Sequence, residues 1–201
     1  MIFGIGYLGY NGRDLVAAKL QNKILARENG IKTLTYKAWE HMLGRCYHEK
    51  TQQANAKTYI DCSVDESWHN FQNFAEWFNK RYKPGYQLDK DLLIKGNRIY
   101  SENTCCLIPE EINKALETSK AKRKEGIPLG VTIIVTNNGT EVIYARYIRK
   151  YLGTFSDINS AWLAYKQEKE NYLKLLAEKY KNEIEENVYQ ALINYKVEIT
   201  D

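Results

Sequence analysis

The segment from Leu129 to Tyr165 constrains the fold most, because it combines a hairpin signal with a helix start. Asn138-Gly139 stands between two strand-prone runs, 129–135 and 142–149, and this dipeptide favours the tight turn of a β-hairpin. A third strand-prone run, 151–155, follows. Asp157 then predicts the N-cap of a long helix. The apolar face of that helix is formed by Ala161, Trp162, Tyr165 and the methylene stem of Lys169.

Alternation along these strands predicts which side chains point away from the helix, because successive side chains of a strand point to opposite faces. We take Ala145 and Tyr147 as facing the helix. The outward residues of the second strand and its turn are then Tyr144, Arg146, Ile148 and Lys150. On the first strand, Thr132 and Ile134 point outward.

The first part of the chain predicts helices around an aromatic core. Residues 1–30 are a glycine-rich start and then a helix with a loose apolar stripe. Residues 36–47 have apolar side chains at helical spacing, with Thr35 as the N-cap. A second amphipathic helix covers residues 66–82, and Asp65 caps it. Its apolar face consists of Trp68, Phe71, Phe74, Ala75 and Phe78.

A strand, strand and helix follow in that order. Residues 86–93 are strand-prone, and Lys95-Gly96-Asn97 predicts a turn. The return side, 98–108, completes a hairpin with a longer loop. Pro109 then opens a helix, at a position where the missing N–H costs least.

These elements predict an α+β protein made of two main units. The 201 residues suit one large domain or two small ones. We assign an N-terminal arm and helix to 1–35, a first unit to 36–117, a linker to 118–128, a second unit to 129–176 and a C-terminal helix to 177–201. The C-terminal helix could dock on the body of the protein or pair with a second copy to form a homodimer.

The chain is mildly basic, with a formal net charge of +4. Residues 1–125 hold 20 Lys and Arg against 15 Asp and Glu, whereas residues 126–201 hold 9 against 10. The linker concentrates Lys120, Lys122, Arg123 and Lys124. These side chains could follow a phosphate backbone or simply be solvated. We expect a cytoplasmic protein with no membrane partner, because no segment approaches the roughly 20 apolar residues of a membrane span.

Residues 129–165 resemble the AP2 DNA-binding domain. The resemblance lies in Gly130-Val131, Tyr144-Ala145-Arg146, the phrase Tyr151-Leu152-Gly153-Thr154-Phe155, and Ala161–Tyr165. In that family a three-stranded antiparallel sheet, packed on a helix, lies in the major groove of DNA. The resemblance implies DNA contacts by Arg146, Lys150, Tyr144 and Thr132. The family usually has arginines where this chain has Thr132 and Ile134, which lowers the expected number of contacts.

Residues 39–113 resemble the HNH-type units that accompany AP2-like domains in phage homing endonucleases. The matching pieces are Trp39–Tyr47, Cys62–Val64 with Trp68 and Phe71, Leu88–Asp91, Gly96-Asn97, Tyr100–Cys105, and Pro109 with Ile112-Asn113. The family has a ββα unit in which a hairpin His deprotonates water and a loop Asn holds that His or the backbone. The helix adds the last ligand to a divalent metal, which stabilises the charge on phosphorus.

By position, the resemblance implies catalytic roles for Asp89, Lys90, Asp91 and Asn103, and it implies Asp89, Asp91 and Asn113 as ligands of Mg²⁺ or Mn²⁺. Lys90 stands where the family has its His. An amine with an unperturbed pKa of about 10.4 is a cation at neutral pH and a poor base, although it could bind phosphate. Either an aspartate acts as the base or hard-cation ligand, or the unit has lost cleavage and kept its DNA-binding shape.

Together the resemblances imply a phage DNA-binding protein, in the host cytoplasm, that cleaves or nicks double-stranded DNA with a divalent metal. One alternative is a regulator that binds DNA without cutting it. Another is a phage protein that binds a host factor through its C-terminal helix and exposed tyrosines. The four cysteines form no Cys-x-x-Cys pair, so buried reduced thiols are favoured over a structural zinc site.

Overall fold

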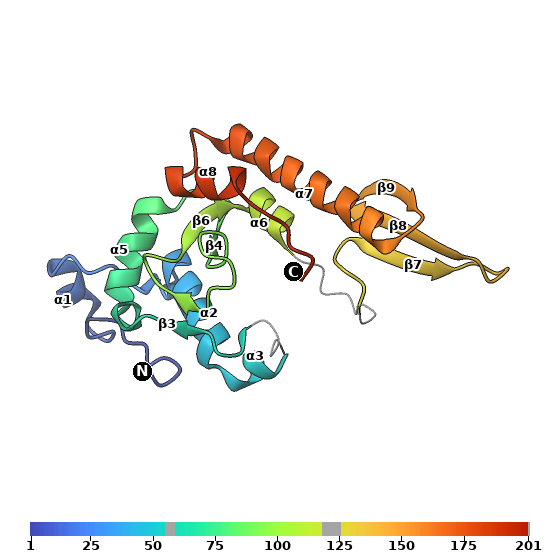
Figure 1. The fold of residues 1–201 in the computed structure, drawn as a ribbon. Coiled ribbons are helices and arrows are strands. Elements are labelled where there is room, and N and C mark those ends of the chain that lie inside the picture. Colours follow the sequence, from blue (N-terminus) through green and yellow to red (C-terminus); the bar gives the residue numbers. More distant parts are fainter. Residues whose placement is uncertain (55–58, 118–125, 201) are drawn as a thin grey trace. The chain divides into compact units, whose positions relative to one another are not determined.

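The computed structural model describes residues 1–54, 59–117 and 126–200. The chain forms two compact units, Met1–Ile108 and Pro109–Asp201 (Figure 1). Both combine helices with small sheets, which confirms the α+β class. The boundary between the units thus falls at residues 108 and 109, before the helix that follows Pro109. We expected that helix to be the last element of the first unit, which we ended at residue 117. The basic residues Lys120, Lys122, Arg123 and Lys124 lie outside the described residues.

The first unit is built around two helices, α2 (Leu34–Tyr47) and α5 (Phe71–Arg81). Their facing side chains, together with Trp68 from the turn before α5, form the predicted aromatic core. Its fully or almost fully buried members include Trp39, Met42, Leu43, Trp68, Phe71, Phe74 and Phe78. The N-cap of α2 is Thr33, not Thr35, because Thr33 Oγ1 accepts the Tyr36 N–H at 3.2 Å. Thr35 instead lies inside the helix and donates to Asn79 Oδ1 at 2.6 Å.

The single helix predicted over residues 66–82 is wrong, because the chain breaks it at Asn70. A 3₁₀ turn, η1 (Glu66–His69), is capped by Asp65, and α5 has its own cap in Asn70. The N-terminal segment causes the break: Tyr7 N donates to His69 O at 2.9 Å, and Phe71 N donates to Tyr7 O at 2.8 Å. These bonds hold the backbone at residue 70 in an extended conformation.

The helix predicted within residues 1–30 is short. α1 covers Leu15–Leu20, and a small hairpin of β1 (Arg27–Glu28) and β2 (Ile31–Lys32) follows. Asn29 and Gly30 form its turn, both with positive φ. Such a turn favours Asn-Gly, so the sequence contained the hairpin signal here as well.

The predicted strand–turn–strand unit exists with a different pairing. β4 (Tyr86–Asp89) pairs with β6 (Cys106–Pro109). β5 (Ile99–Tyr100), expected to pair with β4, instead runs parallel to β3 (Ser63–Val64). In the sequence, the short helix α3 (Glu49–Ala54) comes between α2 and β3.

The second unit contains the predicted sheet and helix. β7 (Val131–Val135), β8 (Glu141–Tyr147) and β9 (Lys150–Phe155) form an antiparallel sheet in that order. α7 (Ile158–Tyr180) begins at the predicted cap, since Asp157 accepts the Ser160 N–H at 2.9 Å. As predicted, Ala161, Tyr165 and Lys169 are buried on its inner face.

α6 (Glu110–Leu116) is fixed within the second unit by hydrogen bonds at both of its ends. The Glu111 carboxylate accepts from Tyr180 Oη at 2.7 Å and pairs with Lys179. At the other end, Tyr147 Oη donates to Ala115 O at 2.9 Å. These contacts explain why α6 belongs with α7 and the sheet.

The C-terminal segment is not one continuous helix. α7 ends at Tyr180, and a separate helix, α8 (Glu186–Ile193), packs against α7. Val188, Leu192 and Val197 are fully buried, so the apolar face of this segment docks within its own unit. Within the described part of the chain, no helix has both the length and the apolar character needed to cross a membrane.

Candidate nucleic-acid interface

The sheet of the second unit has one face against α7 and one face turned away from it. Val131 and Ala145 are buried with Ala161 of α7, which marks the covered face. Thr132 pairs across the strands with Tyr144, and Ile134 pairs with Val142. Because paired residues share a face and neighbours alternate, these four side chains lie on the other face, as predicted for Tyr144, Thr132 and Ile134.

A β-bulge sets the orientation of the third strand. The register shifts between Ala145 and Arg146, so that Arg146 pairs with Tyr151 and Tyr144 pairs with Thr154. The rings of Tyr144 and Tyr151 have centroids 6.0 Å apart. We call the following set the outer face: Thr132, Ile134, Val142, Tyr144, Arg146, Tyr151 and Thr154. Tyr151 and Thr154 could not be placed from the sequence, because nothing in the residue pattern reveals the bulge, whereas Val142 follows from the alternation along β8.

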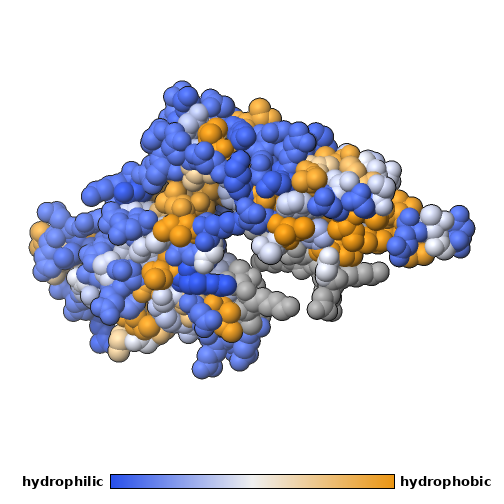
Figure 2. Space-filling view, in the orientation of Figure 1, coloured by the Kyte–Doolittle hydropathy of each residue, from blue (hydrophilic) through white to orange (hydrophobic). Residues whose placement is uncertain are grey.

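The outer face carries no carboxylate, and its residues are exposed at Ile134, Arg146, Tyr151 and Thr154 and half-buried at Thr132, Val142 and Tyr144. Arg146 is exposed, and no described carboxylate lies within ion-pairing distance of its guanidinium. Tyr151 is 57% exposed and Ile134 is 45% exposed. Glu141 is the one acidic residue between positions 131 and 155, and its pairing with Val135 puts it on the opposite face. Figure 2 shows apolar groups gathered over β7 and β8, with a polar tip at the turn that joins them.

Lys150 does not point outward, so the outward direction predicted for it is wrong. It pairs across the strands with Tyr147, and therefore shares the helix-facing side of the sheet. Its Nζ donates to both carboxylate oxygens of Glu168 on α7 at 2.8 Å. Ile148 lies in the turn before it with a positive φ, so strand alternation does not continue from Tyr147 to Lys150. Arg146 is thus the one basic side chain of strands β7–β9 on the outer face.

In the first unit, Asp89 organises the loop after β4. Its Oδ1 accepts the backbone N–H of Asp91 at 2.9 Å and that of Leu92 at 2.7 Å. The desolvation of this half-buried group raises the pKa of the Asp89 carboxyl above its ordinary value, although the two N–H groups oppose the shift. Asp89 therefore acts as a turn cap that is costly to ionise.

Lys90 is buried in this loop, with only 5% of its surface exposed. Its ammonium donates to Asp91 Oδ1 at 2.6 Å and to Asn97 O at 2.8 Å, and it lies 6.0 Å from the centre of the Tyr100 ring. A phosphate in solvent cannot reach an ammonium held in this way. These contacts oppose a role of Lys90 in phosphate binding, which stays a prediction from the sequence.

Three asparagines of the HNH-like segment lie in different surroundings. Asn97 holds the loop, because its Nδ2 donates to Lys90 O at 2.8 Å and to Ile99 O at 2.7 Å. Asn103, expected to hold the catalytic loop, is exposed in a tight turn closed by Cys105 N and Ser101 O at 3.0 Å. Asn113 is half-buried on α6 and belongs to the second unit.

The carboxylates of Asp89 and Asp91 do not fit a divalent metal. One oxygen of Asp89 is taken by two backbone N–H groups, and Asp91 already neutralises the Lys90 ammonium. A divalent ion placed beside a buried ammonium would be repelled by it. Among residues 1–54, 59–117 and 126–200, no group of three or more His, Cys, Asp or Glu side chains is arranged to hold a metal ion.

Replacing Asp89 by asparagine should preserve the fold and make the protein at least as stable as the wild type at neutral pH. The amide oxygen can still accept both N–H groups, while the charge disappears. Because the folded-state pKa of Asp89 is raised, ionisation costs stability above that pKa, and the cost vanishes as pH falls below the unfolded value of about 3.9. Urea unfolding at neutral and acid pH measures the difference. The free energy of unfolding of the variant minus that of the wild type should be larger at neutral pH than at acid pH. A smaller difference at neutral pH would contradict this prediction.

All four cysteines are buried, and none of them forms a disulfide bond. Burial raises the pKa of the Cys46 thiol and that of the Cys105 thiol to about 12 each. Both groups are therefore neutral thiols near pH 7, which are poor nucleophiles.

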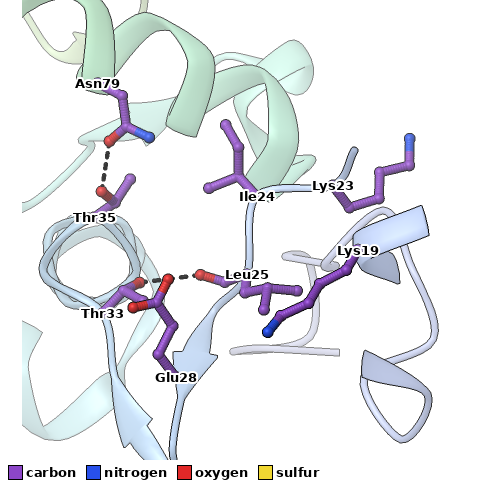
Figure 3. Close-up of a pocket in the computed structure, with 8 residues that line it drawn as sticks. All are labelled: Lys19, Lys23, Ile24, Leu25, Glu28, Thr33, Thr35 and Asn79. Carbon is purple, nitrogen blue, oxygen red and sulfur yellow. Dashed lines mark hydrogen bonds between the residues drawn. The ribbon is translucent and has the colours of Figure 1, made fainter. Parts of the chain in front are cut away.

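A pocket of about 430 Å³ lies in the first unit (Figure 3). Its wall includes Lys19, Lys23, Glu28, Thr33, Thr35 and Asn79. The two hydroxyl groups are already used inside the protein: Thr35 bonds to Asn79, and Thr33 bonds to Leu25 O at 3.2 Å. Glu28 adds an acceptor beside the lysines, and we assign the pocket no function.

The outer face of the sheet offers one guanidinium and two tyrosines and no carboxylate. The exposed chemistry of the β4 loop lacks both a free base and a metal-ligand set. A scan against protein-family models and searches of curated proteins and of solved structures gave no match to this chain. The HNH-like and AP2-like resemblances therefore stay predictions from the sequence.

Proposed function

We propose that the protein binds double-stranded DNA through the outer face of the β7–β9 sheet. The observation that supports this most directly is the exposed Arg146 guanidinium on a face without carboxylates. An unpaired cation on an acid-free surface attracts phosphates and base acceptors. The AP2-like sequence pattern points to the same face.

The outer face has the shape and the groups that groove binding requires. The major groove of B-DNA admits a β-ribbon, and its base edges then meet the outward side chains. Arg146 can donate two hydrogen bonds to guanine. The hydroxyl groups of Thr132, Thr154, Tyr144 and Tyr151 can donate to phosphate oxygens at the groove walls.

We further propose binding without cleavage. The group at the expected catalytic His position, Lys90, is buried. The neighbouring Asp91 carboxylate, which is half-exposed, is held in an ion pair with that ammonium, and this opposes its use as a general base. This favours the non-cutting regulator over the nuclease. The β4 loop then serves as a scaffold.

Replacing Arg146 by alanine should weaken duplex binding about 10-fold, because one bidentate base contact is lost. Replacing Lys150 by alanine is the matched control, since it also removes one basic side chain of the same hairpin but one that faces α7. Its affinity should change less than about twofold. Fluorescence anisotropy with a labelled duplex over a range of salt concentrations measures both affinities.

Three results would overturn parts of this proposal. If Arg146→Ala and Lys150→Ala lost affinity equally, the outer face would not be the DNA-contacting surface. If the wild-type protein did not bind duplex DNA even at low salt, DNA would not be the partner. Supercoiled plasmid incubated with wild-type protein and Mg²⁺ or Mn²⁺ should stay supercoiled. Nicking by the wild-type protein that disappears in Asp89→Ala or Asp91→Ala would instead support the nuclease hypothesis.

A further inference from the structure

The outer face is more apolar than phosphate binding alone requires. Ile134 and Val142 lie directly opposite each other on adjacent strands, and Ile134 is 45% exposed. Tyr144, the next outward residue on β8, lies between Val142 and Arg146. The outer face thus has an apolar end at Ile134 and Val142 and a cationic end at Arg146.

The apolar end of the outer face is suited to the thymine methyl groups of the major groove. The thymine C5-methyl is the apolar group that the base edges present there, whereas the other groups are hydrogen-bond donors and acceptors. An aliphatic pair pressed against donors and acceptors would leave them unsatisfied, which costs free energy. Against thymine methyls, the same pair would bury apolar surface on both sides.

We propose that Ile134 and Val142 contact thymine methyl groups, so that the protein prefers duplexes with thymine at this end of its site. This inference rests on the proposed DNA binding by the outer face. DNA is the occupant rather than an apolar protein surface because Arg146 lies on the same face without a counter-ion among the described residues, and Glu141 is excluded from it. An unpaired guanidinium complements a polyanion.

The strand geometry also gives a spacing. Val142 and Arg146 are four residues apart on β8, which is about 13 Å at about 3.3 Å per residue. DNA rises by about 3.4 Å per base pair, so this span is about four base-pair steps if β8 follows the groove. A guanine read by Arg146 would then lie about four base pairs from a thymine read by Val142.

The test replaces thymine by uracil, which removes the methyl group and keeps every base-pairing group. The two probes are an alternating A·T duplex and the matching A·U duplex, with affinities measured by fluorescence anisotropy on the full chain. Wild-type protein should bind the A·U duplex roughly fourfold more weakly for each methyl that it contacts. The double variant Ile134→Ala with Val142→Ala should bind both duplexes equally.

Val135→Ala is the matched control. Val135 is the neighbour of Ile134, is 60% exposed, and lies on the opposite face of β7 through its pairing with Glu141. It should retain the full preference for thymine. Circular dichroism and the midpoint of thermal unfolding, measured for each variant, show whether the sheet is intact.

A preference for thymine in wild type and Val135→Ala, lost in the double variant, supports the inference. Equal binding of A·T and A·U duplexes by wild type, with affinity that still falls in Arg146→Ala, would overturn the methyl contact and leave DNA binding standing. A preference that persists in a folded double variant would also overturn it. No binding to either duplex at low salt would overturn the proposed function itself.

Discussion

Replacing Gly130 by alanine should unfold the second unit or cost it more than about 3 kcal/mol of stability. Gly130 has φ +78°, and a Cβ added there would lie 2.0 Å from Cδ2 and 2.2 Å from Cγ of Tyr165. The ring cannot move aside easily, because it is buried and packs on Tyr147 with centroids 5.7 Å apart. The Gly130 carbonyl also accepts the Arg146 N–H at 2.8 Å, so the backbone is held too.

Gly139→Ala separates steric overlap from backbone strain. Gly139 has φ +81°, yet a Cβ there would meet nothing within 4 Å. The Gly139→Ala substitution should lower the free energy of unfolding only by the strain of a left-handed alanine, about 1–2 kcal/mol. Urea unfolding followed by circular dichroism measures both variants. Similar losses in the two would mean that Tyr165 can move away from Gly130.

The sheet and the start of α7 could be predicted from local signals. Asn138-Gly139 and Asp157 determine a turn and a cap through contacts a few residues away, and both were located correctly. The break at Asn70 could not be predicted in this way. It depends on hydrogen bonds from Tyr7, which is more than 60 positions away in the chain.

The candidate site shows the same contrast. Arg146, Tyr144 and Thr132 follow strand alternation from Ala145, so their placement could be predicted. The outward direction assigned to Lys150 failed, because Ile148 interrupts the alternation in the turn before it. No residue pattern marks either this turn geometry or the bulge beside Arg146.

Lys90 and Lys169 show why burial of a charged residue is hard to predict. Lys169 was placed on the inner face of α7 through its methylene stem, but its ammonium is buried as well and donates to Leu116 O at 3.2 Å. Lys90 was expected to face phosphate. The Lys169 ammonium depends on a carbonyl 53 positions away, and the Lys90 ammonium on the loop fold that brings it to Asp91 and to the Asn97 carbonyl. These hydrogen bonds make burial tolerable, and sequence alone does not show them.

Replacing Lys90 by alanine should destabilise the first unit by about 3 kcal/mol. The change leaves the Asn97 carbonyl and the Asp91 carboxylate without their shared donor and empties a buried site. Lys80→Ala is the control, because Lys80 is exposed on α5 and should change stability by less than about 0.5 kcal/mol.

The same urea experiments test whether Lys90 or a metal holds the loop. With the ammonium as the internal cation, the free energy of unfolding of wild-type protein should be equal with EDTA and with Mg²⁺. A metal bound to the folded state would instead stabilise it by RT ln(1 + [M]/Kd), which is about 2.7 kcal/mol at 100 times Kd.

Stabilisation by Mg²⁺ that disappears in Asp89→Ala would show that the carboxylates bind metal despite Lys90. Unfolding free energies that are insensitive to Mg²⁺, together with a large loss in Lys90→Ala, would show that the β4 loop is held by its own ammonium.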